Sequence, residues 1–92
     1  MGIETSAFRQ FNMKAKIYSA GWCGHCRRAK ALLESAQIDY DEIDVDTEDG
    51  VDEFRFLMRN LHVRSIPQVF IDEKFIGGYA ELKNFLTEQK LL

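Results

Sequence analysis

The chain has 92 residues, of which 46% are hydrophobic, and its 12 Lys and Arg against 15 Asp and Glu leave a formal net charge of −3. This length corresponds to one domain, and the apolar fraction excludes a disordered chain. The excess of acids argues against nucleic-acid binding, and no apolar run approaches the roughly 20 residues of a membrane span. We expect one globular domain with neither nucleic acid nor membrane as a partner.

The first residues of the chain carry no pattern for export. Residues 1–5 lack the basic and then apolar order of a secretory signal, and two cysteines cannot form the disulfide framework of small secreted domains. We therefore expect a cytoplasmic protein. Residues 1–13 are polar and weakly periodic, which predicts an N-terminal extension ahead of a domain that covers residues 14–92.

The first half of this domain predicts two strands joined by a helix. Residues 14–19 form a short strand, and residues 38–45 alternate between apolar and polar as a second strand. Residues 24–36 predict a helix whose core-facing side chains are Cys26, Ala29, Leu33 and Ala36, with Arg27, Arg28, Lys30 and Glu34 on the solvent side. Because a helix joins the two strands, they should pair in parallel through a right-handed crossover.

The second half predicts a helix, a hairpin and a final helix. Residues 51–61 carry an apolar stripe, and the acids before them suit a helix N-terminus. Residues 68–71 and 74–76 predict a hairpin that turns at Asp72 and Glu73, and apolar residues from 82 to 86 mark the last helix. The order β-α-β-α-β-β-α predicts an α/β domain with a four-stranded mixed sheet flanked by helices.

The two cysteines, Cys23 and Cys26, lie where the first strand meets the first helix, separated by Gly24 and His25. Structural zinc sites use the same spacing, but zinc needs two further ligands, and the histidines are only His25, between the thiols, and His62. Two buried, inert cysteines are another interpretation, since Cys26 lies on the core-facing stripe. Cys23 does not, and this difference favours a redox-active dithiol.

The position of Cys23 at the start of the helix favours its thiolate. Unpaired backbone N–H groups and the helix dipole stabilise an anion there. His25, Arg27 and Arg28 add positive charge nearby, although ordinary solvation explains the arginines equally well. We expect an exposed Cys23 to attack a substrate disulfide, and a less exposed Cys26 to displace the substrate and close the Cys23–Cys26 bridge.

Between residues 14 and 90 the sequence resembles the glutaredoxins. The resemblance rests on the CxxC after the first strand, on the block Ser65-Ile66-Pro67-Gln68-Val69-Phe70-Ile71, and on Phe75-Ile76-Gly77-Gly78-Tyr79. It implies a thioredoxin fold and an enzyme that uses glutathione to reduce protein disulfides or glutathionylated thiols. It also implies glutathione as a co-substrate, no tightly bound cofactor, no metal and a monomer.

The same resemblance assigns site residues beyond the catalytic Cys23 and Cys26. In the family, the proline that matches Pro67 is cis and faces the dithiol, so Ser65 and Ile66 would offer backbone groups to glutathione. A loop proline at the start of an edge strand is the alternative from the sequence alone. The γ-glutamyl end of glutathione is expected at the start of the last helix, on Gly78, Tyr79, Ala80 and Glu81.

The active-site sequence departs from the family pattern. Glutaredoxins commonly carry Cys-Pro-Tyr-Cys, whereas here Trp22 precedes Cys-Gly-His-Cys, as in the catalytic domains of protein disulfide isomerases, so we expect Trp22, Gly24 and His25 to modulate the dithiol. Two other functions stay open. One is a protein disulfide oxidase or isomerase. The other is a carrier of a [2Fe–2S] cluster, held by Cys23 in a glutathione-ligated dimer.

Overall fold

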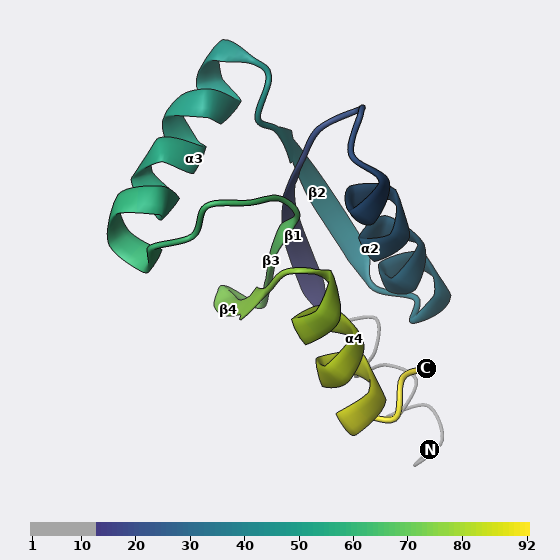
Figure 1. The fold of residues 1–92 in the computed structure, drawn as a ribbon. Helices are drawn as coiled ribbons and strands as arrows, with labels where there is room; N and C mark the ends of the chain where they lie inside the picture. The colour runs from purple at the N-terminus through teal and green to yellow at the C-terminus, as the bar shows by residue number, and fades with distance from the viewer. Residues whose placement is uncertain (1–12) are drawn as a thin grey trace.

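The computed structural model describes residues 13–92, so the predicted extension over residues 1–13 lies outside the described residues except for Met13. The elements follow in the predicted order (Figure 1): β1 (Lys14–Ser19), α2 (Gly24–Ser35), β2 (Asp39–Asp44), α3 (Glu48–Leu61), β3 (Gln68–Ile71), β4 (Lys74–Gly77) and α4 (Tyr79–Glu88). Among these helices, none is long and apolar enough to cross a membrane.

The four strands form one mixed sheet in the order β2-β1-β3-β4. β1 pairs with β2 in parallel and with β3 antiparallel, and β3 pairs antiparallel with β4. Asp72 and Glu73 form the hairpin turn with φ values of 51° and 67°, the left-handed backbone that matches the twist of a two-residue hairpin. The predicted parallel pair and hairpin are both confirmed.

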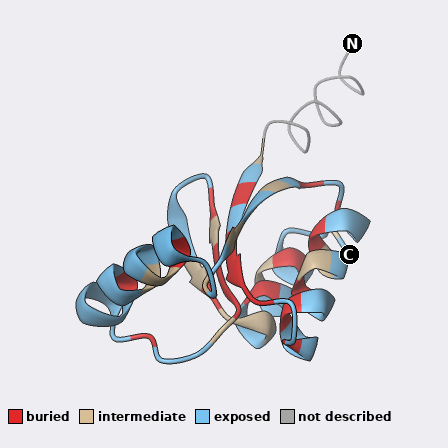
Figure 2. Ribbon diagram, turned by 90° about the horizontal axis from the view of Figure 1, so that it is seen from above, coloured by how far each residue is buried: buried red, intermediate tan, exposed pale blue. Residues whose placement is uncertain are grey.

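Both faces of the sheet are covered by helices, and the side chains that alternate along β1 pack on one face or the other. Ala15 and Ile17 belong to the main core, which packs against α2 and α4. Tyr18 faces the other way and packs with Leu57 of α3 in a smaller cluster. Figure 1 shows α2 and α4 together on one side of the sheet and α3 on the other, and Figure 2 shows how the buried residues concentrate where the helices meet the strands.

Helix α3 begins at Glu48, three residues before the start predicted from its apolar stripe. Thr47 is its N-cap, and its hydroxyl accepts a hydrogen bond from the backbone N–H of Gly50 at 3.0 Å. Glu48 and Asp49 therefore lie inside the first turn, where they complement the helix dipole. The apolar stripe could not show that the helix starts at Glu48, because the residues of its cap and first turn are polar.

Candidate active site

The dithiol lies at the junction of β1 and α2. Cys23 is the N-cap of α2, and its Sγ accepts a hydrogen bond from the backbone N–H of Cys26 at 3.1 Å. The backbone N–H of Cys23 in turn donates to the carbonyl of Ala20 at 3.2 Å. The side chain of Cys23 therefore receives one of the free N–H groups at the helix N-terminus, as its position in the sequence predicts.

Both thiols are free and buried, and this corrects the expectation of an exposed Cys23. Cys23 retains 7% of its accessible surface and Cys26 retains none. Ala20 is buried with them, and Val45 and Ile66 pack against the three residues. The predicted order of accessibility holds, since a substrate reaches Cys23 before Cys26, but only a small part of Cys23 is open to solvent.

Burial raises the pKa of the Cys26 thiol from its ordinary 9.0 to about 12, and a hydrogen bond with Cys23 acts in the same direction. A backbone hydrogen bond with Ala20 and the charge of Lys30 act in the opposite direction. At neutral pH Cys26 is therefore a protonated thiol in the reduced protein. It must lose this proton before it can act as a nucleophile.

This pKa predicts that the reduced protein loses stability in alkaline solution. The folded state holds the Cys26 proton up to about pH 12, whereas an unfolded thiol releases it near its ordinary 9.0. The stabilisation is complete below that lower value and is lost as the pH rises through 9 toward 12. Urea unfolding at about pH 8 and about pH 10 measures the loss. The control is the oxidised protein, which has no thiol proton to lose; equal slopes for both forms would contradict the prediction.

Two other segments meet the dithiol. The carbonyl of Ile66 lies 3.9 Å from the Sγ of Cys23, and the Ile66–Pro67 peptide bond is cis. Gly78 lies against this loop, because a Cβ at Gly78 would come 3.5 Å from the carbonyl oxygen of Pro67. The rings of Tyr79 and His25 are 6.0 Å apart between centroids. The structure thus brings together residues that lie 43 positions apart in the sequence (Cys23 and Ile66) and 54 positions apart (His25 and Tyr79).

Ser65 precedes Ile66 in the chain, and the other predicted glutathione-binding residues lie at the start of α4. Ser65 is exposed, and its carbonyl accepts a hydrogen bond from the side chain of Gln68 at 2.9 Å. Gly78 is the N-cap of α4, and its backbone N–H donates to Oε1 of Glu81 at 2.9 Å. The carboxylate of Glu81 therefore caps its own helix, while Ala80 is exposed. An anionic ligand at this helix end would have to share it with Glu81.

Trp22 is 70% exposed beside the buried Cys23. Its indole N–H donates to Oδ2 of Asp46, in the loop between β2 and α3, at 2.9 Å. Gly24, on the other side of Cys23, is exposed and has room for a side chain, since a Cβ there would have only Arg27 within 4 Å. From the sequence, we expect the acids before residue 51, which include Asp46, to stabilise a helix N-terminus. The contact between Asp46 and Trp22 depends on how the loop after β1 meets the loop after β2, which the sequence pattern does not show.

A second group that sequence reasoning missed lies beneath the dithiol. Ser19 is fully buried at the end of β1, and its hydroxyl donates to Oε2 of Glu42. The ammonium of Lys30 donates to the same oxygen at 2.9 Å. The hydrogen bonds from Ser19 and Lys30 hold the pKa of Glu42 below its usual range. The helical pattern alone placed Lys30 on the solvent side of α2, where no partner could be foreseen.

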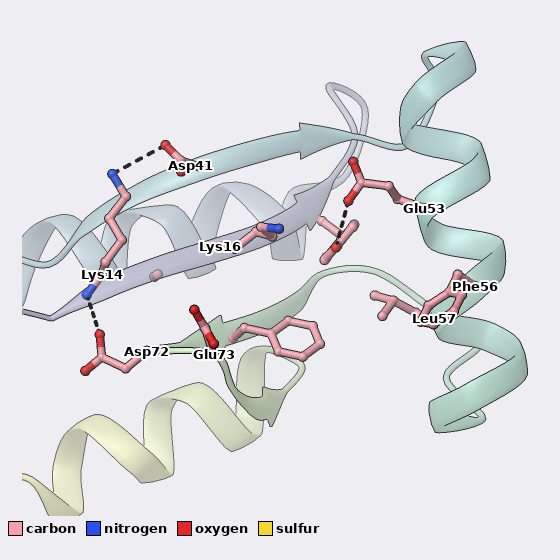
Figure 3. Close-up of a pocket in the computed structure, with 11 residues that line it drawn as sticks. Lys14, Lys16, Asp41, Glu53, Phe56, Leu57, Asp72 and Glu73 are labelled. Carbon is pink, nitrogen blue, oxygen red and sulfur yellow. Dashed lines mark hydrogen bonds and ion pairs between the residues drawn. The ribbon is translucent and has the colours of Figure 1, made fainter.

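A groove of about 780 Å³ lies elsewhere, on the α3 side of the sheet. Figure 3 shows Lys16 and Glu73 near one part of it and Phe56 at another, with Glu53 hydrogen-bonded to Tyr18. Neither cysteine and none of the predicted glutathione-binding residues lines it. Within residues 13–92 we also find no group of three or more His, Cys, Asp or Glu side chains arranged to hold a metal ion.

Comparison with known proteins agrees with this architecture. A sequence model of the family Glutaredoxin matches residues 15–76. Glutaredoxin 1 of Rickettsia prowazekii is 33% identical over 75 residues, which are 82% of this chain and 79% of that protein. A dithiolic glutaredoxin from Trypanosoma brucei brucei has a TM-score of 0.76 at 28% identity, covering 92% of this chain and 89% of that one. The buckwheat glutaredoxin–glutathione complex has a TM-score of 0.77 at 27% identity, with 99% and 84% covered. These likenesses confirm the predicted thioredoxin fold.

Proposed function

The chain belongs to the glutaredoxin family of oxidoreductases, and on that basis we propose that it uses glutathione to reduce protein disulfides or glutathionylated thiols through Cys23 and Cys26. The observation that carries the proposal is the placement of Cys23. Its Sγ lies at the N-terminus of α2 within hydrogen-bond distance of a backbone N–H, and it is the more accessible thiol of the pair. A sulfur that is the more accessible of the pair and lies at the helix N-terminus is placed to be the attacking thiol.

The reaction proceeds in two exchanges. The thiolate of Cys23 attacks one sulfur of the substrate disulfide, and the other sulfur leaves with the electron pair as a thiolate. When the sulfur bound to Cys23 belongs to a protein, Cys26 attacks Cys23, releases the protein thiolate and forms the Cys23–Cys26 disulfide. When it belongs to glutathione, a second glutathione can attack it and regenerate Cys23 without Cys26.

Glutathione binding is proposed at the surface that surrounds Cys23. The carbonyl of Ile66 is near the sulfur, where the backbone of an extended peptide can pair with it. The N-terminus of α4, at Gly78 and Tyr79, offers backbone N–H groups to the γ-glutamyl carboxylate. The buckwheat relative was solved with glutathione. Ser65, Ala80 and Glu81 are proposed as outer contacts, with Glu81 giving up its cap as the ligand arrives.

We expect measurable turnover of a small glutathionylated disulfide when glutathione, glutathione reductase and NADPH are supplied. NADPH oxidation, followed by absorbance, measures the rate. The control is Cys23→Ser at the same concentration, which reports the uncatalysed exchange. If the wild-type protein oxidises NADPH no faster than this variant, the hypothesis of a glutathione-dependent enzyme is wrong.

An oxidase or isomerase is the second candidate, favoured by Trp22, which lies 70% exposed against Cys23 where a protein substrate would dock. The redox potential separates the two: a reductant lies near thioredoxin's roughly −270 mV and an isomerase near about −180 mV.

The [2Fe–2S] carrier stays a prediction from the sequence. We also propose that the enzyme acts as a cytoplasmic monomer and that residues 14–92 form its catalytic domain.

A further inference from the structure

Lys30 is a partly buried cation one helical turn beyond Cys26. Its side chain is 21% exposed, although the helical pattern placed it on the solvent side. Residues four apart on a helix lie on the same side, with Cβ atoms about 5–6 Å from each other. Cys26 is fully buried at the start of this turn. The two side chains therefore share the part of α2 that faces the end of β1.

Two neighbouring strands hold Lys30 in place. Glu42 of β2 is in register with Ile17 of β1, so it points toward α2 as Ile17 does. Its Oε2 accepts hydrogen bonds from the ammonium of Lys30, at 2.9 Å, and from the fully buried hydroxyl of Ser19. The carboxylate stays charged at neutral pH because these bonds lower its pKa. The ammonium is thus fixed near the dithiol rather than free in solvent.

Within residues 13–92, few charges that could take this role surround Cys26. The titratable groups that act on its pKa are Cys23, which raises it, and Lys30, which lowers it. Ala20, Val45 and Ile66, which pack around the two thiols, are uncharged. The side chain of Glu42 is 39% exposed, and its carboxylate accepts hydrogen bonds from Lys30 and Ser19. Burial dominates and raises the pKa of the Cys26 thiol, and Lys30 is the side-chain cation that acts in the opposite direction.

We propose that Lys30 is a positioning residue for the second exchange, in which its ammonium, held by Glu42, favours the Cys26 thiolate that closes the active-site disulfide. This inference rests on the proposed function. In this exchange the proton of Cys26 passes to solvent, a bond forms between Sγ of Cys26 and Sγ of Cys23, and the bond from Cys23 to the substrate sulfur breaks. The electron pair leaves with the substrate thiolate.

The sign of the charge distinguishes this role from a structural one. Lys30→Met keeps the apolar stem and removes the cation, so it should slow disulfide closure. Glu42→Gln keeps an oxygen that accepts from Ser19 and Lys30 but removes the anion, so closure should be faster or unchanged. If the network served only to hold α2 against the sheet, both variants would weaken it and both would slow closure.

The experiment mixes the reduced protein with glutathione disulfide, quenches with acid at successive times, and separates the mixed disulfide from the closed disulfide by mass. For Lys30→Met we expect closure to slow by about three- to tenfold, with its pH profile shifted to higher pH, because the charge that favours the Cys26 thiolate is lost. Formation of the mixed disulfide should change less than about twofold, because that step uses Cys23 and not Cys26. Lys30→Arg should restore closure.

Lys16→Met is the matched control, because Lys16 lies exposed on the opposite face of β1 and lines the groove of Figure 3. Circular dichroism of every variant shows whether it folds. Unchanged closure in Lys30→Met, or equal slowing in Lys30→Met and Glu42→Gln, overturns the role of Lys30. If the wild-type protein forms neither the mixed disulfide nor the closed disulfide, the proposed function itself fails, which is a separate result.

Discussion

Cys23→Ser abolishes both the reduction of protein disulfides and glutathione-linked exchange, because Cys23 is the thiol at the N-terminus of α2 that a substrate can reach. A serine hydroxyl retains the N-cap hydrogen bond from the backbone of residue 26, so the fold should survive while the nucleophile is lost. We expect activity to fall to the uncatalysed rate in the NADPH-coupled assay and in an insulin-reduction assay.

Cys26→Ser provides the contrast. It keeps Cys23 and therefore retains the exchange in which a second glutathione resolves the mixed disulfide. It loses the route that needs intramolecular closure, so reduction of protein disulfides should fall to background. Trapping of a stable mixed disulfide between Cys23 and a protein substrate, detected by non-reducing electrophoresis, is the expected signature. Equal loss of both activities in the two variants would refute this division of roles.

Gly50→Ala destabilises the fold, although helix propensity alone predicts the opposite. In a helix interior, alanine is about 1 kcal/mol more favourable than glycine. Here, however, a Cβ at residue 50 would lie 1.9 Å from the carbonyl oxygen of Asp44 and 2.8 Å from Oγ1 of Thr47. That oxygen of Asp44 also accepts from the backbone N–H and the hydroxyl of Thr47, at 3.1 and 2.7 Å. The start of α3 must therefore move and weaken its own cap.

The expected cost is about 1–3 kcal/mol or more, as for overpacked interiors. In a domain of this size each kcal/mol lowers the melting temperature by roughly 4–8 °C, which calorimetry resolves easily. Because Asp46 lies between Asp44 and Thr47 and holds Trp22, the fluorescence of this single tryptophan should change as well. Gly21→Ala is the control, since no atom lies within 4 Å of a Cβ there. A Gly50→Ala protein as stable as this control would contradict the structure.

Much of the fold follows from local pattern. The alternation in β1, the apolar stripe of α2 and the two-residue turn at Asp72 and Glu73 are each set by neighbours along the chain, and the structure has them where the sequence predicts them. Element boundaries follow less directly: α3 starts at Glu48 because Thr47 caps it, and polar caps carry no apolar signal. The burial of Cys23 was wrongly predicted, since Val45 and Ile66, from two other segments, pack against it.

The sequence alone determined the family, the order of the elements and the identity of the dithiol, because these depend on residue types at short, regular spacing. Only the tertiary structure decided the surroundings of that dithiol. The carbonyl of Ile66 lies beside Cys23 across 43 positions, Asp46 holds Trp22 across 24, and Glu42 holds Lys30 across 12. Such contacts depend on strand register and on how loops meet, which periodicity does not encode. They set the burial of the thiols and the charge that acts on them, and so the chemistry of the site.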